Sequence, residues 1–232
     1  IEANPRASRT VPFVSKATGL PLVRLAVGAM LGDPVAESEA APVPPNGLIC
    51  VKMPVLPFDR FPGEDTVLGP EMKSTGEVMG VGGDFGEAFA KAEIGAGTLL
   101  PESGTVFLSV ADQDKRAIAF LARRLVELGF DLIATGGTAR FLALNGVGVT
   151  QVYKMAEGGP NAVSLLEEGK VQLVLNSPRG RQSKADGKAI RQAALERGVP
   201  CVTTLPGMIA AVSGIESRLR GEARVRALQE FL

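Results

Sequence analysis

The stretch Phe130-Asp131-Leu132-Ile133-Ala134-Thr135-Gly136-Gly137-Thr138-Ala139-Arg140 decides the fold of the C-terminal half. Its apolar residues predict a short strand that runs into Thr-Gly-Gly-Thr and then into a helix starting near Thr138. Free backbone N–H groups converge at such a junction, which suits a phosphate. The glycines let the backbone approach an anion, and the threonine hydroxyls can donate hydrogen bonds to it. The alternative interpretation is a glycine-rich turn with a threonine helix cap and no ligand.

Strands and helices alternate around this stretch, from about residue 105 to the end of the chain. The expected strands are 106–110, 132–134, 149–153, 171–175 and 199–203. The expected helices are one from about residue 114 to 128 and then 138–145, 161–168, 185–197 and 208–219. Because each strand is followed by a helix, we predict an α/β fold with a five-stranded, parallel, doubly wound sheet in a domain spanning residues 105–232.

Residues 1–104 have a different pattern, which predicts a separate α+β part. Apolar residues at helical spacing follow Pro21 up to Gly32, and a proline-rich stretch over 33–46 predicts a loop or linker. The segment 48–58 predicts an edge strand broken by prolines, and 84–93 predicts a helix. We expect this part to fold poorly alone, because its apolar faces need a partner surface.

Composition excludes several classes of function. The chain has 25 Lys+Arg against 25 Asp+Glu, no Trp and one Tyr, so no basic footprint for nucleic acid is present. No apolar run approaches the roughly 20 residues that a membrane span needs. Only two cysteines occur, without metal-ligand spacing, which favours a reducing compartment and a cytoplasmic protein. There is no histidine, so histidine-based catalysis and histidine-ligated zinc are excluded within the chain.

The candidate site lies where the predicted strands end. Ligands of doubly wound sheets bind beyond the carboxyl ends of the strands, near the point where strand order reverses. The residues expected there are Ser109, Lys115, residues 135–138, Lys154, residues 176–180, Thr203 and Thr204. Together they supply cations, hydroxyl and backbone donors and an amide, which is typical of a site for a phosphorylated small molecule. For Lys115 or Lys154 taken alone, a solvated surface position would be the preferred interpretation.

The N-terminal residues suggest a second site. Glu2 and Asn4 would lie on one face of a strand, where their oxygens can reach one hard cation such as Mg²⁺. Arg6 and Arg9 could then meet phosphates. The alternative is a charged, capped start of a helix.

The segments 2–16, 57–63 and 68–80, together with residues 105–225, resemble the C-terminal part of the carbamoyl-phosphate synthase large subunit. The resemblance implies the end of the second ATP-grasp module followed by a methylglyoxal-synthase-like allosteric domain. It implies a C-terminal fragment of an ATP-dependent ligase that makes carbamoyl phosphate from bicarbonate, glutamine-derived ammonia and ATP for pyrimidine and arginine synthesis. The implied partners are the rest of the large subunit, a glutamine amidotransferase small subunit and further copies in an oligomer. By itself the fragment is expected to be catalytically silent.

The resemblance also assigns roles to individual residues. Glu2 and Asn4 match metal ligands for Mg²⁺ or Mn²⁺ with ATP, and Arg6 matches the catalytic-site arginine beside them. A regulatory nucleotide, UMP in preference to IMP, is expected to bind at Lys115, Thr135, Gly136, Gly137, Thr138, Lys154 and Asn176.

The sequence departs from the family pattern at three positions. Gly136 replaces a frequent histidine, Pro178 stands where some relatives have a nucleotide-contacting threonine, and Met53 replaces an acidic residue of ornithine-activated relatives. A free-standing methylglyoxal-synthase-like phosphate lyase is the alternative function, against which the missing histidine counts. A dinucleotide-dependent oxidoreductase would need a Gly-x-Gly-x-x-Gly turn after the first strand, where residues 111–115 read Ala-Asp-Gln-Asp-Lys.

Overall fold

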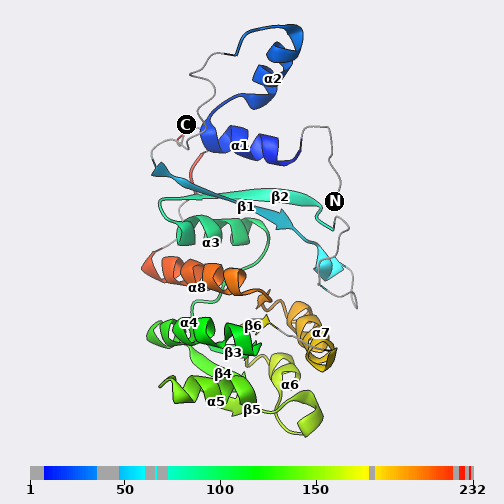
Figure 1. Cartoon of the computed structure of the whole chain (residues 1–232), viewed down its shortest axis with the longest axis vertical. Coiled ribbons are helices and arrows are strands. Elements are labelled where there is room, and N and C mark those ends of the chain that lie inside the picture. The colour runs from blue at the N-terminus through cyan, green and yellow to red at the C-terminus, as the bar shows by residue number, and fades with distance from the viewer. Residues whose placement is uncertain are drawn as a thin grey trace.

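The structure, a computed structural model, describes residues 8–35, 47–60, 66, 73–177, 181–221, 225–227 and 230. Two sheets lie at different levels of an elongated stack (Figure 1). A two-stranded antiparallel sheet packs on helix α3, α3 packs on α8, and α8 packs on α4 above a five-stranded sheet. The molecule is therefore a series of layers that continue from one part of the chain into the other.

The five-stranded sheet confirms the predicted fold class. Its strands are β3 (Thr105–Val110), β4 (Asp131–Thr135), β5 (Thr150–Val152), β6 (Leu173–Ser177) and β7 (Cys201–Val202). They lie in the order β5-β4-β3-β6-β7, and each neighbouring pair is parallel. Strand β3 is first in sequence but central in space, so the strand order reverses beside it. The binding edge predicted from the sequence is therefore the carboxyl end of β3 and its two neighbours.

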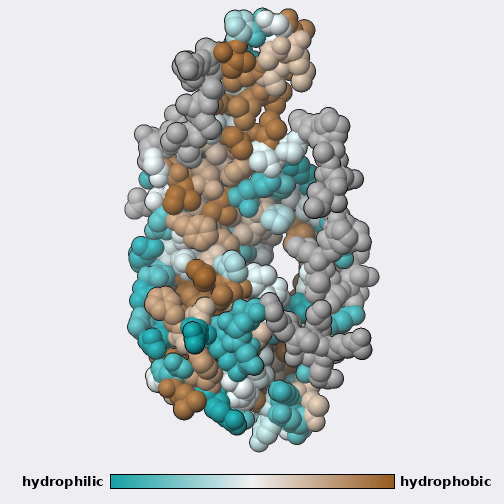
Figure 2. Space-filling view, in the orientation of Figure 1, coloured by the Kyte–Doolittle hydropathy of each residue, from teal (hydrophilic) through white to brown (hydrophobic). Residues whose placement is uncertain are grey.

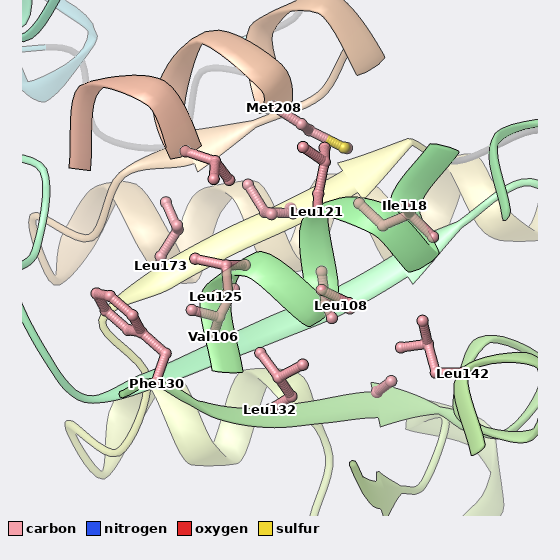
Figure 3. Close-up of a cluster of buried hydrophobic side chains, with 14 of the residues drawn as sticks. Val106, Leu108, Ile118, Leu121, Leu125, Phe130, Leu132, Leu142, Leu173 and Met208 are labelled. Atoms are coloured by element: carbon pink, nitrogen blue, oxygen red, sulfur yellow. The ribbon is translucent and has the colours of Figure 1, made fainter. Parts of the chain in front are cut away.

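Alternating side chains of the central strands feed two apolar clusters on opposite faces of the sheet. Val106 and Leu108 of β3 point into a cluster that includes buried residues of the helices α4, α5 and α8, and Figure 3 shows ten of its side chains labelled. Phe107 points into the second cluster with residues of α6 and α7. A strand alternates its side chains in this way, so the apolar run of β3 is covered on both faces.

The helices of this unit are α4 (Lys115–Glu127), α5 (Gly136–Leu144), α6 (Ala162–Glu167), α7 (Arg181–Glu196) and α8 (Leu205–Arg220). Short 3-10 turns lie at Asp112–Asp114 and Met155–Glu157. The prediction that a helix begins near Thr138 is wrong by two residues: Thr135 is the N-cap, and Gly136 and Gly137 form the first turn of α5. The two glycines thus belong to the helix and bring its free N–H groups directly to the end of β4.

The N-terminal part contains α1 (Thr10–Thr18), α2 (Leu22–Leu31), β1 (Ile49–Val55), a 3-10 turn (Phe58–Arg60), β2 (Gly76–Gly82) and α3 (Phe85–Gly95). Strand β1 runs unbroken through Pro54, contrary to the prediction of a strand broken by prolines. Within the described residues β1 pairs only with β2, so the proline needs no second partner on its other side. The α+β character of this part agrees with the sequence.

Small residues allow the layers to approach closely. A Cβ at Gly80 of β2 would lie 1.9 Å from the Ala88 carbonyl oxygen of α3, and a Cβ at Gly86 of α3 would lie 2.4 Å from the Ser213 carbonyl oxygen of α8. Leu100 and Phe89 from the N-terminal part also reach the apolar cluster beside α8. The predicted boundary between residues 104 and 105 is thus crossed by close packing, and the independence of the two domains stays a prediction.

Helix α2 is the exception to this close packing. None of its residues is buried, and Met30 and Leu31 are more than three quarters exposed. Figure 2 shows hydrophobic residues gathered on the surface over this helix. Across the described ranges no single helix is long and apolar enough to span a membrane, although α1 and α2, bent by 109°, meet the length and composition test as a pair.

Candidate functional site

A cavity of about 600 Å³ opens at the carboxyl edge of the five-stranded sheet. The residues that line it are Phe107, Ser109, Val110, Ala111, Asp112, Gln113, Lys115, Thr135, Gly137, Thr138, Tyr153, Lys154, Met155, Ala162, Asn176, Ser177, Asp186, Gly187 and Ile190. Six of the seven predicted nucleotide residues are in this set, the exception being Gly136. A volume of this size falls within the range of small-molecule sites, about 300–1,000 Å³.

Strand register sets the polar residues in one row across the sheet edge. Ser109 of β3 pairs with Asn176 of β6, and Thr135 of β4 pairs with Val152 of β5. Because Leu108 pairs with Ala134, Ser109 and Thr135 end neighbouring strands side by side. Their hydroxyl oxygens are 3.1 Å apart and share a hydrogen bond. The sequence prediction that these strand ends meet is confirmed.

The N-terminus of α5 points its first backbone N–H groups toward this row. Thr135, the N-cap of α5, makes no side-chain hydrogen bond to the helix, and its hydroxyl shares a hydrogen bond with Ser109. Thr138 is buried, and its Oγ1 accepts a hydrogen bond of 3.2 Å from the Val110 N–H. This bond leaves the Thr138 hydroxyl proton available as a donor. A helix start with uncapped N–H groups is a natural position for an anion.

Lys115 brings a cation to the same place. A Cβ at Gly137 would lie 3.6 Å from the Lys115 Nζ, so the ammonium group sits against the first turn of α5. The lysine side chain is only 17% exposed, and its Nζ is 2.6 Å from the Asp112 Oδ1, whose side chain is 95% exposed. The hydrogen bond from Lys115 and its positive charge lower the pKa of Asp112. The cation is thus held at the cavity by a carboxylate that lies almost entirely in solvent.

Asn176 contributes a buried amide. The residue is 2% exposed, and its Nδ2 is buried without a hydrogen-bond partner in the part of the chain that the structure describes. A buried donor left unpaired costs about 1–3 kcal/mol. Since Asn176 lines the cavity, an acceptor on a bound molecule would remove this cost.

On the opposite side of β4, residues 153–155 follow strand β5. Lys154 lines the cavity and caps the 3-10 turn Met155–Glu157, where its backbone N–H donates to the Glu157 Oε2 at 2.9 Å. A backbone bond of this kind fixes the start of the turn, while the side chain of Lys154 stays exposed. The cavity therefore has a second lysine at its outer rim.

The structure adds Asp114 and Tyr153, which sequence reasoning missed, and gives a partner to Ser177, which lies in the expected stretch 176–180. The Ser177 hydroxyl donates to the Asp114 Oδ2 at 2.8 Å, and the Ala111 N–H donates to the Ser177 carbonyl at 3.2 Å. These bonds brace the turn before α4 against the end of β6. Tyr153, the neighbour of Lys154, also lines the cavity. The acidic residues within 112–114, just before Lys115, were the sequence signal that could have indicated the role of Asp114.

Other candidate residues do not join this site. Thr203 and Thr204 are not among the lining residues, and the Thr204 hydroxyl instead accepts a hydrogen bond of 3.3 Å from the Gly207 N–H at the start of α8. Nearby, burial raises the pKa of the Cys201 thiol to about 12, as expected of a core cysteine. The two threonines cap and precede α8 and have no part in the cavity.

The second predicted site consists of residues near the N-terminus. Glu2, Asn4 and Arg6 lie outside the described residues, as does Pro178. Among the residues that the structure does describe, no group of three or more acidic or cysteine side chains is arranged to hold a metal ion. The metal and ATP assignments therefore stay predictions.

Comparison with known proteins finds similar sequences over the whole chain. The family model of the MGS-like domain matches residues 117–203. Carbamoyl phosphate synthase large chains match the whole chain: that of Rubrobacter xylanophilus is 53% identical over 232 residues, covering 100% of this chain and 22% of the relative. That of Acidobacterium capsulatum is 49% identical over 99% of this chain and 22% of the relative. That of Archaeoglobus fulgidus is 47% identical over 100% of this chain and 22% of the relative.

The chain thus spans about a fifth of the length of these relatives. The match extends beyond the MGS-like domain to the N-terminal layers with α1–α3. The chain thus contains an MGS-like domain at residues 117–203, and its whole length is similar to the C-terminal fifth of carbamoyl phosphate synthase large chains.

Proposed function

We propose that the cavity binds a nucleoside monophosphate and that the chain is the regulatory part of a carbamoyl phosphate synthase. The observation that carries this proposal is the convergence of the α5 N-terminus, Lys115, Thr138 and Asn176 on one cavity. Each group alone has a structural explanation. Their arrangement around a single space of about 600 Å³ is better explained by a phosphorylated ligand.

The phosphate is assigned to the end of the cavity at α5. There it would receive hydrogen bonds from the first N–H groups of the helix and from the Thr135 and Thr138 hydroxyls, and it would face the Lys115 ammonium group. Lys154 would reach the phosphate from the rim. The Asp112 carboxylate would give up its ion pair with Lys115 as the anion arrives.

The remainder of the ligand is assigned to the space between Asn176 and residues 153–155. The unpaired Asn176 Nδ2 supports an acceptor oxygen on a sugar or base at that position. UMP is our first candidate for the effector and IMP the second. The replacement of an acidic residue by Met53 argues against ornithine as a regulator, since its ammonium group would lack a counter-ion there.

For the intact enzyme we propose the activity that its relatives' name describes, the synthesis of carbamoyl phosphate. Bicarbonate, glutamine-derived ammonia and ATP would be its substrates, with pyrimidine and arginine synthesis as its pathways in the cytoplasm. Glu2 and Asn4 would hold Mg²⁺ or Mn²⁺ on ATP, and Arg6 would act beside them. A glutamine amidotransferase subunit and the rest of the large chain would be its partners, in an oligomer, and the present chain would have no catalysis alone.

Calorimetric titration of the 232-residue chain with UMP, IMP and ornithine tests the regulatory site. Lys154→Ala should weaken nucleotide binding by about 1.5–3 kcal/mol, the range for a hydrogen bond to a charged group. Lys170→Ala is the matched control, because this lysine is 65% exposed in its side chain and pairs with Glu168 outside the cavity. Unchanged affinity in both Lys154→Ala and Thr138→Ala would show that the site is wrongly assigned.

A further inference from the structure

The residues that line the cavity form a polar part and an apolar part. Hydroxyls, an amide and a lysine gather around the end of α5, while an apolar wall is made by Phe107, Tyr153, Met155, Ala162 and Ile190. Inorganic phosphate or a sugar phosphate would use only the first group. The apolar wall suits a ligand that also carries a flat, weakly polar ring.

Tyr153 lies between the polar part and the apolar part of the cavity. Tyr153 directly follows Val152, which pairs with Thr135 on the neighbouring strand. Since Thr135 is the N-cap of α5, the backbone of Tyr153 lies beside the start of that helix. Its N–H donates to the Pro160 carbonyl at 3.1 Å, and the residue forms an isolated bridge with Asn161. The loop between them is therefore closed on itself, and the tyrosine is fixed beside the phosphate end of the cavity.

The tyrosine ring is supported on one side by backbone. Gly159 has a φ of +114°, and a Cβ there would lie 2.7 Å from the Tyr153 Cδ2 and 3.0 Å from its Cε2. Only glycine fits such a conformation at this distance from a ring. Tyr153 is nevertheless 49% exposed and lines the cavity, so the ring is held from one side and open on another.

We propose that Tyr153 is the specificity-determining residue of the site, a preformed stacking platform for the nucleobase. The proposal rests on the function proposed above, since the phosphate end must be anchored for the base to reach the ring. Stacking on an aromatic side chain strengthens binding of a base without reading its identity. The site then prefers nucleoside monophosphates to sugar phosphates, and the hydroxyl group of Tyr153 is not required.

The composition of the chain provides a direct readout. Tyr153 is the only tyrosine and there is no tryptophan, so intrinsic fluorescence excited in the tyrosine band reports this one ring. UMP should change that fluorescence at saturation. Ribose 5-phosphate and inorganic phosphate, which lack a base, should bind without a comparable change.

Calorimetry on variants completes the test. Tyr153→Leu should weaken UMP binding about 5- to 100-fold and leave ribose 5-phosphate affinity unchanged, while Tyr153→Phe should retain the wild-type preference. Equal losses for both ligands in Tyr153→Leu would reveal a structural role of the loop and overturn the proposal. So would unchanged UMP affinity in that variant. If the wild-type chain binds none of the three ligands, the proposed function itself fails, which is a different result.

Discussion

Helices α4 and α2 show how differently the two parts of the chain use apolar residues. Helix α2 reads LVRLAVGAML and is apolar on nearly every side, yet it buries no residue. Helix α4 reads KRAIAFLARRLVE, with charged residues near both ends, and it buries Ile118, Ala119, Leu121, Ala122 and Leu125. The spacing of apolar residues, and not their number, decides which helix this structure covers.

The physical reason lies in the width of the apolar stripe. A stripe on one face, as in α4, can be covered by one sheet, whereas a helix that is apolar all round needs cover from several directions. The described residues supply that cover for α4 and not for α2. Since the relatives are almost five times longer, the rest of an ATP-grasp module is the cover that the sequence predicts for α2, and this stays a prediction.

A leucine-to-alanine substitution in each helix gives the largest expected difference between α4 and α2. Leu125→Ala removes a side chain with 0% exposure from the cluster between α4 and the sheet, and it should lower the free energy of unfolding by about 2–5 kcal/mol. Leu31→Ala in α2, at a position 80% exposed, should change it by less than about 0.5 kcal/mol. Urea unfolding followed by circular dichroism measures both. Equal losses would mean that α2 is covered after all.

A second substitution, Gly80→Ala, tests the close packing of the layers that lie between the two sheets. Gly80→Ala places a Cβ 1.9 Å from the Ala88 carbonyl oxygen, so α3 must move away from β2. We expect a loss of about 1–3 kcal/mol, the usual range for overpacking. Gly76→Ala is the control on the same strand, because a Cβ there meets nothing within 4 Å.

Limited proteolysis locates the effect of Gly80→Ala. If the first 104 residues form a separable part, cleavage should increase there, while UMP binding at the cavity is retained. A simultaneous loss of UMP binding would contradict the predicted division and would indicate that the layers up to α8 unfold as one unit.

The sequence alone predicted those elements for which the local residue pattern and the overall topology agree. The stripe of α4 and the five βα units follow from periodicity, and the site edge follows because the ends of parallel strands coincide. Helix α1 begins directly after Arg9, where a helix start was the alternative interpretation, but its extent over Thr10–Thr18 was not predicted, since Val11, Pro12 and Val14 give this segment little helix propensity. The start of α5 was misplaced because Thr135 and Thr138 are both plausible N-caps.

The missed site residues depend on contacts that no local pattern encodes. The role of Asp114 requires Ser177, which is 63 positions away in the chain. The position of the Tyr153 ring depends on the left-handed backbone of Gly159, in a loop that reads as a simple turn. Sequence alone gives the residue types at the sheet edge, and the structure is needed to show which of them meet.

The smallest expected effect concerns Asp84, the residue that ties the N-terminus of α3 to the end of α8. Its Oδ1 accepts a hydrogen bond of 2.8 Å from the Glu87 N–H, and its Oδ2 accepts one of 3.0 Å from Arg220. Asp84→Ala loses both and should cost about 1 kcal/mol, the typical value for an N-cap. Asp84→Asn keeps a good cap and loses only an exposed ion pair, so it should cost less than about 0.5 kcal/mol.

The pH dependence of the Asn variant separates these two contributions. The hydrogen bond from the Glu87 N–H and then the charge of Arg220 lower the pKa of Asp84 in the folded chain. A carboxylate with a lowered folded pKa contributes its full stabilisation above its unfolded pKa of about 3.9 and loses it as pH falls through the folded pKa. The stability difference between wild type and Asp84→Asn should therefore shrink to nothing on acidification, as measured by urea unfolding at each pH. A difference that stayed constant would mean that the carboxylate charge contributes nothing to the joint between α3 and α8, which would then be held by apolar and glycine packing alone.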